Sequence, residues 1–159
     1  MMGERRVMQE ALFYGFSLER HVPNDHLLRK KLALGPPVID EQRATLYLDA
    51  AIVRANGPRH EIFALSLTDG STQPGWPLDV AAALGASFDP SAQNQRGALA
   101  LFKGKVFVPF SGHWGDCGAY HGFVVGISID DLGKVSSFST RARGGGIWAQ
   151  GGGAVDAVP

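Results

Sequence analysis

The chain has 159 residues, of which 45% are apolar and 19% charged, and its 15 basic and 15 acidic side chains leave no formal net charge. A protein built around nucleic acid usually carries an excess of Lys and Arg that neutralises phosphates, so this balance argues against such a role for the whole chain. The single cysteine, Cys117, excludes an internal disulfide. No run of about eighteen apolar residues occurs, so we expect no membrane span.

Residues 5–34 have the pattern of two short helices. Apolar side chains recur at the spacing of one helical face, at Val7, Met8, Ala11 and Leu12. Pro23 breaks this pattern, and a second helix is expected over His26–Leu32 before Gly35-Pro36-Pro37 ends it. The N-terminus from Met1 to Glu10 is polar and charged and lacks the apolar core of a signal peptide, which predicts a cytoplasmic product.

After Pro37 the apolar spacing changes from helical to alternating, which predicts strands. Six strands are predicted, at Thr45–Asp49, Glu61–Leu67, Ala98–Phe102, Val106–Phe110, Phe123–Ile129 and Val135–Phe138. The 21 glycines supply many tight turns, as in a sandwich, a barrel or a propeller. Residues 38–80 and 98–138 also repeat one order of strands and turns, and each is roughly as long as a four-stranded propeller blade.

The segment Val22-Pro23-x-Asp25-His26-x-Leu28-Arg29 resembles the start of insertion-sequence transposases, over about residues 3–30. In that family it precedes a nuclease core in which three carboxylates hold two metal ions. The resemblance stops at Lys30, and no parallel α/β pattern follows, so we expect no transposase reaction. The basic residues of this region suit a solvated face better than a DNA-binding surface. They are Arg5, Arg6, Arg20, Arg29, Lys30 and Lys31.

The segment Phe63-Ala64-Leu65-Ser66-Leu67-Thr68-Asp69-Gly70, followed by Trp76, is similar to the blade signature of quinoprotein-like (PQQ-repeat-like) β-propellers. Ser66 replaces the usual aspartate and Asp69 the usual threonine. Further segments resemble a bacterial group of these repeat proteins, namely Asn94–Arg96, His113–Gly122 and Gly144–Trp148.

The propeller resemblance implies a mainly β fold of about two four-stranded blades and the first strand of a third, after a short helical N-terminal segment. We therefore divide the chain into a helical transposase-like segment, 1–34, and a partial propeller, 35–159. The blades are expected at about 37–80 and 97–140, and the third begins at 144–156, with its strand near Ile147–Val155. Trp76 and Trp148 are expected to pack between blades.

His113, Asp116, Cys117 and His121 are the candidate metal ligands, because imidazole, thiolate and carboxylate groups all bind zinc. Their spacing fits no known metal motif, and glycines between them predict a loop whose polar groups satisfy the backbone, so we predict no metal site. Cys117 beside His113 or His121 also suggests a thiolate–imidazolium pair, but a free apolar cysteine is the simpler interpretation.

No cofactor is predicted. The triads Gly144-Gly145-Gly146 and Gly151-Gly152-Gly153 lack the Lys and Ser/Thr of a phosphate-binding loop and are expected to be turns. The resemblance to quinoproteins suggests pyrroloquinoline quinone as a cofactor. Binding it takes groups from most blades of a ring, a calcium ion and commonly an adjacent cysteine pair, whereas two blades and one cysteine are present here.

Together these patterns predict a gene fusion whose product is a non-catalytic propeller fragment, at most an interaction module. Insertion of a transposase start would have removed the export signal of the parent propeller. Unpaired strand edges predict self-association or pairing with other blades, without membrane or DNA partners. Two alternatives stay open, a transposase-related DNA-binding protein and a quinone- or metal-dependent enzyme module that is completed by assembly into a full ring.

Overall fold

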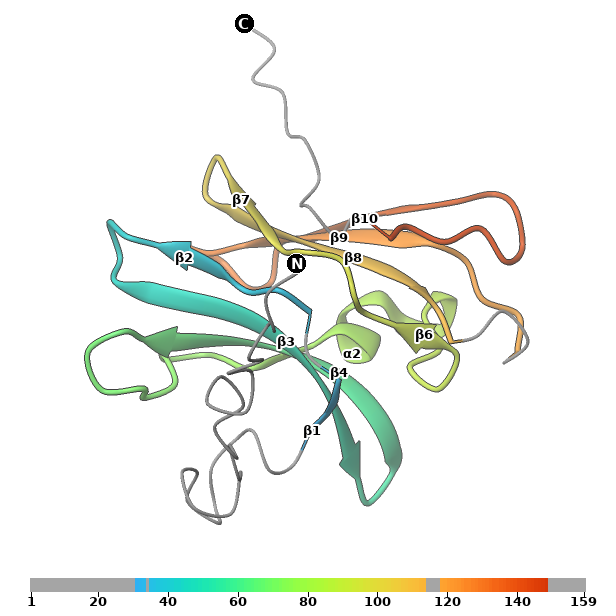
Figure 1. Cartoon of the computed structure of the whole chain (residues 1–159), viewed down its shortest axis with the longest axis horizontal. Coiled ribbons are helices and arrows are strands. Elements are labelled where there is room, and N and C mark those ends of the chain that lie inside the picture. Colours follow the sequence, from blue (N-terminus) through green and yellow to red (C-terminus); the bar gives the residue numbers. More distant parts are fainter. Residues whose placement is uncertain (1–30, 34, 114–117, 149–159) are drawn as a thin grey trace, which may run out of the picture. The chain divides into compact units, whose positions relative to one another are not determined.

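The computed structural model describes residues 31–33, 35–113 and 118–148, which belong to one compact unit beginning at Lys31 (Figure 1). Several predictions fall outside these residues. They are the helical face near Val7, the transposase-like segment 3–30, the candidate ligands Asp116 and Cys117, and most of the strand expected at 147–155. The described part is mainly β and contains two antiparallel sheets, as the sequence predicts.

The first sheet is built around a long hairpin. Its strands are β1 (Lys31–Ala33), β2 (Val38–Asp40), β3 (Thr45–Arg54), β4 (Gly57–Ser66) and β5 (Leu78–Asp79). β3 and β4, ten residues each, pair over their whole length from Thr45 opposite Ser66 to Arg54 opposite Gly57. β2 pairs with the beginning of β3, β1 pairs with its end, and β5 lies on the other side of β4.

The second sheet has the same topology. Its strands are β6 (Gln93–Asn94), β7 (Ala100–Phe102), β8 (Lys105–Gly112), β9 (Phe123–Ser128) and β10 (Val135–Ser139). β7 pairs with the beginning of β8, β6 pairs with its end, and β9 and β10 follow in order. β1 and β2 therefore correspond to β6 and β7, so each sheet consists of four antiparallel strands of which the first is interrupted.

The interruptions of the two first strands contact each other. The Leu99 amide, between β6 and β7, donates a hydrogen bond of 3.0 Å to the carbonyl of Pro36, between β1 and β2. Gly35 lies so close to the side chain of Gln95 that a Cβ at this position would overlap with it. The two sheets are thus joined backbone to backbone where equivalent strands break.

Each of the six predicted segments forms a strand, in the predicted order. β3 and β4 are longer than the segments predicted for them. The helix predicted over His26–Leu32 is wrong at its end, because Lys31–Ala33 form β1. There Lys31 lies opposite Ile52, and cross-strand hydrogen bonding overrides the local helical pattern. The sequence predictions did not include the helix α2 (Val80–Leu84), the short 3₁₀ turn Gly85–Ser87 or the residue ranges of the short strands β1, β2, β5 and β6. No helix in the described ranges has both the length and the apolar character required to cross a bilayer.

The core lies between the two sheets. Alternation places Tyr47, Ile62 and Ala64 of the first sheet on the core side, and Val108, Phe110, Val125 and Ile127 on the core side of the second. Phe88, which follows the 3₁₀ turn, packs edge-on against Phe110 and Phe123 with ring centroids 5.0 and 5.5 Å away. Trp76 packs against Tyr47 of the first sheet, with ring centroids 5.5 Å apart, and its packing between blades stays a prediction.

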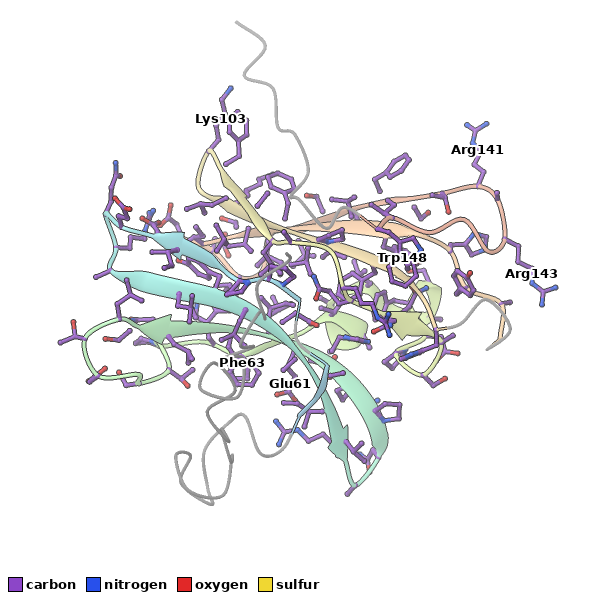
Figure 2. All side chains as sticks on the ribbon, in the orientation of Figure 1. Glu61, Phe63, Lys103, Arg141, Arg143 and Trp148 are labelled. Atoms are coloured by element: carbon purple, nitrogen blue, oxygen red, sulfur yellow. The ribbon has the colours of Figure 1, made fainter. Side chains whose placement is uncertain are left out.

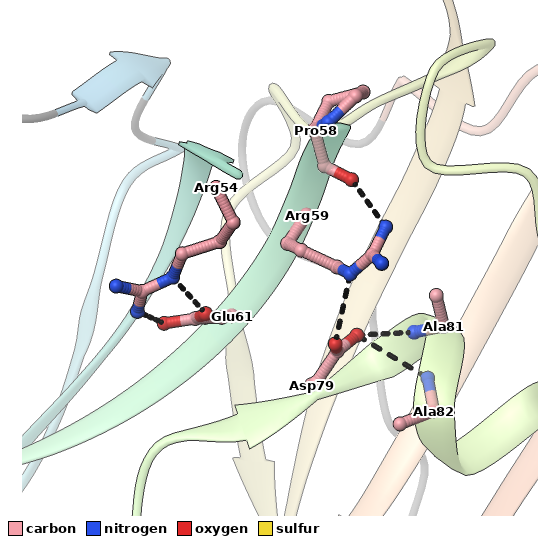
Figure 3. A network of polar contacts seen from close by, with 7 residues as sticks. All are labelled: Arg54, Pro58, Arg59, Glu61, Asp79, Ala81 and Ala82. Atoms are coloured by element: carbon pink, nitrogen blue, oxygen red, sulfur yellow. Dashed lines mark hydrogen bonds and ion pairs between the residues drawn. The ribbon is translucent and has the colours of Figure 1, made fainter. Parts of the chain in front are cut away.

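Two arginines neutralise a pair of carboxylates at the β4–β5 edge (Figure 3). Glu61 lies directly opposite Asp79, an arrangement of like charges that destabilises a sheet. Arg54 binds Glu61 through two hydrogen bonds of 2.9 and 2.6 Å, and Arg59 lies 3.3 Å from Asp79. Asp79 also accepts hydrogen bonds from the amides of Ala81 and Ala82, so the same carboxylate caps α2.

Replacing Phe88 with alanine should show how far the two sheets depend on the core between them. We expect Phe88→Ala to lower the free energy of unfolding by about 3–5 kcal/mol, because the ring is only 3% exposed and contacts residues of the second sheet. Val53→Ala, at a side chain that is 62% exposed, should change it by less than about 0.5 kcal/mol. Urea unfolding measures both values, and equal losses would contradict a shared core.

Candidate functional site

Three segments that sequence analysis singled out meet at one end of the second sheet. Asn94 lies opposite Ser111, and the amide of His113 donates to the carbonyl of Ala92 at 3.2 Å. The Gly144 amide donates to Tyr120 at 2.9 Å, and the Ile147 amide to Phe110 at 3.4 Å. We call this region the polar end. It comprises the described residues of 92–96, 110–113, 118–122 and 140–148.

Glycines at the polar end allow its backbones to approach closely. A Cβ at Gly112 would overlap with the ring of Tyr120, and one at Gly146 would overlap with the Ser111 hydroxyl. A Cβ at Gly122 would come within 2.7 Å of the carbonyl oxygen of Gly145. Gly144, with φ of 75°, does make the predicted turn. Close packing, and not turn formation alone, accounts for the glycines here.

Polar side chains are buried at this end. Gln93, Asn94, Gln95 and Ser111 are each at most 4% exposed. The side-chain amide of Gln95 donates to the carbonyl of Gly97. Gln93 Oε1, Asn94 Oδ1 and Ser111 Oγ have no protein hydrogen-bond partner in the described part, although buried polar atoms usually have one. Hydrogen bonds among the described residues of the two sheets therefore do not involve these three side-chain oxygens.

An arginine and a tryptophan lie together on the surface of the polar end. The Arg96 guanidinium is 5.8 Å from the centre of the Trp148 ring, within the range of a cation–π contact. Trp148 is 45% exposed, so the predicted role of packing between blades is not fulfilled among the described residues. Figure 2 shows Trp148 over the second sheet, with Arg141 and Arg143 projecting from the turn after β10.

Beneath the polar end, a histidine–aspartate pair is buried in the core. His60 of β4 is 1% exposed and Asp49 of β3 is fully buried. His60 Nδ1 lies 3.5 Å from Asp49 Oδ2, and Nε2 lies 2.9 Å from the Gln93 carbonyl oxygen. Both neighbours are hydrogen-bond acceptors, so both favour the protonated form of the His60 ring. Its bond to Gln93 connects the first sheet to β6 of the second.

The environments of two histidines shift their pKa values in opposite directions. Burial lowers the pKa of His60, but the hydrogen bond and negative charge of Asp49, with the carbonyl of Gln93, outweigh burial and raise it. Burial also lowers the pKa of His113, and the positive charges of His60 and Arg96 lower it further. The pKa of His113 therefore lies below the ordinary histidine value and that of His60 lies above it.

The four candidate metal ligands are only partly described. His121 Nδ1 lies 3.0 Å from the Thr140 carbonyl oxygen, which makes this nitrogen a donor and fixes the ring. His113 lies at the end of β8, while Asp116 and Cys117 fall outside the described residues. Within the described ranges, no group of three or more His, Cys, Asp or Glu side chains is placed to hold a metal ion.

Sequence analysis missed the Asp49–His60 pair. The sequence contains a signal for this pair, because Asp49 interrupts an otherwise apolar run from Leu46 to Val53. The alternation of side chains along β3 directs Asp49 to the core. His60 lies on the same face of the neighbouring strand, since Asp49 is opposite Ile62 and Ala51 is opposite His60. A charged side chain at a core position predicts a buried partner.

Comparisons of the chain with family models, with characterised proteins and with solved structures found no match. The arrangement itself is suited to binding. It combines buried hydrogen-bonding groups, an exposed aromatic ring and an arginine. Its glycines allow the backbone segments that carry these groups to approach one another closely.

The raised pKa of His60 makes stability depend on pH. Its folded-state pKa is above the unfolded value, so its contribution is complete below the unfolded pKa, about 6.5, and is lost as pH rises through the folded pKa. We expect the free energy of unfolding to fall over that range, as measured by urea titrations at stepped pH.

The Asp49→Asn/His60→Gln double variant removes both charges of the pair and should abolish this slope. Asp49→Asn alone should lower the folded-state pKa of His60 toward or below its unfolded value, so the fall in stability with rising pH should shrink or reverse. His60→Gln alone leaves a buried carboxylate without its cation and should cost about 3–5 kcal/mol. A wild-type slope that persists in the double variant would assign the pH dependence to another group.

Substitution of Gly146 tests the close packing at the polar end. Gly146→Ala should destabilise the fold by about 1–3 kcal/mol, because the new methyl group overlaps with Ser111 Oγ and approaches Trp148 Nε1. Ser111→Ala in the same chain removes the hydroxyl and should recover part of the loss in a double-mutant cycle. Gly133→Ala, in an exposed turn, is the matched control. Additive losses for Gly146 and Ser111 would mean that they do not interact.

Proposed function

We propose that the β region is two blades of a quinoprotein-like β-propeller and acts as a non-catalytic interaction module. The observation that carries this proposal is the repeated topology. Each sheet consists of four consecutive antiparallel strands with an interrupted first strand, and the two sheets pack against each other around one core. Propeller blades are four-stranded antiparallel sheets that follow one another along the chain.

The outer face of the second sheet supports association with a further blade. Since Val106 and Val108 face the core, alternation places Phe107 on the opposite face, where its ring lies against Gly126. Val124 and Phe138, which are opposite each other on β9 and β10, lie on the same outer face. Phe138 is 63% exposed. An apolar face of this kind, together with an unpaired strand edge, is typical of an interaction surface.

We also propose that this fragment was joined to a transposase start by gene fusion. This proposal rests on the sequence resemblance of residues 3–30. The role of the polar end in the parent protein would depend on blades beyond these two, so the module by itself binds partners and does not catalyse a reaction.

The solution mass of the full chain tests the interaction role. Size exclusion with light scattering should give a discrete species larger than the 16.9 kDa chain. Phe138→Ser should shift it toward the monomer, because Phe138 belongs both to the outer face and to the exposed edge strand. Leu67→Ser is the control, since Leu67 is 47% exposed but lies on the first sheet after β4. A wild-type monomer that unfolds cooperatively would refute the proposal.

A further inference from the structure

β10 has a strand edge unlike the others in the described part. The other strands that end a sheet or pair along only part of a neighbour are short, two or three residues each, namely β1, β2, β5, β6 and β7. β10 has five residues, Val135–Ser139, and no described strand pairs with its outer side (Figure 1). Proteins protect such edges with short strands, charges or proline. β10 contains neither a charge nor a proline.

The backbone groups that β10 presents at this edge follow from its pairing with β9. The Lys134 carbonyl accepts a hydrogen bond of 3.2 Å from Ser128, and the Thr140 amide donates one of 2.9 Å to Gly122. In an antiparallel pair, alternate residues direct both their N–H and C=O groups to the same neighbour. The even-numbered residues therefore face β9, and Val135, Ser137 and Ser139 direct their backbone groups to the free edge.

We propose that two copies of this chain pair through β10, antiparallel and centred on Ser137. This inference rests on the proposed interaction role and names its partner. Ser137 then lies opposite Ser137 of the second copy, and Val135 lies opposite Ser139. All outward N–H and C=O groups of the strand find partners in both copies. Each copy has one such edge, so the two-fold axis closes the assembly at a dimer.

The side chains of β10 favour a second copy as the partner. In this register each Phe138 lies opposite Ser136 of the other copy on the outer face, and the two Phe138 rings are diagonal neighbours within reach of each other. The antiparallel arrangement brings the end of β10 that carries Arg141 and Arg143 to the end that carries Asp131. In the monomer, Asp131 forms an exposed ion pair with Lys134 at 3.1 Å and accepts a hydrogen bond from the Gly133 amide. A parallel pair would bring the arginines of both copies together instead.

A proline at position 137 tests the edge directly. Ser137→Pro removes an N–H group that points away from β9, so it deletes a hydrogen bond of the dimer and none of the sheet, and proline is tolerated at such edge positions. We expect the wild-type chain to show about twice the 16.9 kDa mass and Ser137→Pro to raise the dimer dissociation constant at least about tenfold. Ser137→Ala keeps the N–H group and should remain dimeric.

Ser137→Lys provides a second test that does not depend on how well the proline variant folds. It places two like charges across the two-fold axis, so the dimer should dissociate at low salt and reform in part at high salt. Circular dichroism checks that each variant keeps its strands.

The outcomes separate the two proposals. If Ser137→Pro and Ser137→Lys stay associated while Phe138→Ser dissociates, the chain associates through its outer face. That result overturns the edge dimer and leaves the interaction role intact. A wild-type monomer overturns both.

Discussion

A buried histidine in the space between the sheets constrains the rest of the structure. His60 is held on one side by Asp49 and on the other by the backbone of Gln93, so its position fixes both the β3–β4 hairpin and β6. The rings of Phe88 and Phe110 pack edge-on against it at 6.0 and 5.1 Å. A buried ion pair gives little net stability compared with apolar side chains of the same size, but it tolerates few alternative arrangements. We regard it as the element that specifies how the two sheets meet.

The same pair is linked to the polar end through Gln93. The carbonyl of Gln93 binds His60 below, while the neighbouring Asn94 pairs with Ser111 in the strand above. Ser111 in turn lies against Gly146, which leads to Trp148. A continuous series of backbone and side-chain contacts therefore runs from the core to the exposed indole ring. Groups placed on such a support keep their geometry when a partner binds, which lowers the entropic cost of recognition.

The sequence predicts the strands well because alternation and turn residues are local signals. It does not predict β1, whose residues have a helical pattern and become a strand only through pairing with β3. The short β6 is also missed, since a strand of two residues is too short to show an alternation of apolar and polar side chains. At the candidate site, three segments were found from resemblance, but their meeting depends on contacts between residues far apart in the chain. Asp49 and His60 were detectable as polar side chains at core positions, and only the register of β3 and β4 shows that they are diagonal neighbours on one face.

The contact between the two interrupted first strands has an evolutionary consequence. Gly35 packs on Gln95, and Pro36 accepts a hydrogen bond from Leu99, so the break in the first sheet docks against the break in the second. A unit that carries such a break can be duplicated in tandem, because every new copy brings both halves of the joint. Insertions within the breaks would displace the neighbouring unit, whereas the segments between β4 and β5 and between β8 and β9 lie outside the joint. Tandem copies should therefore tolerate long insertions in those connections and not in the breaks.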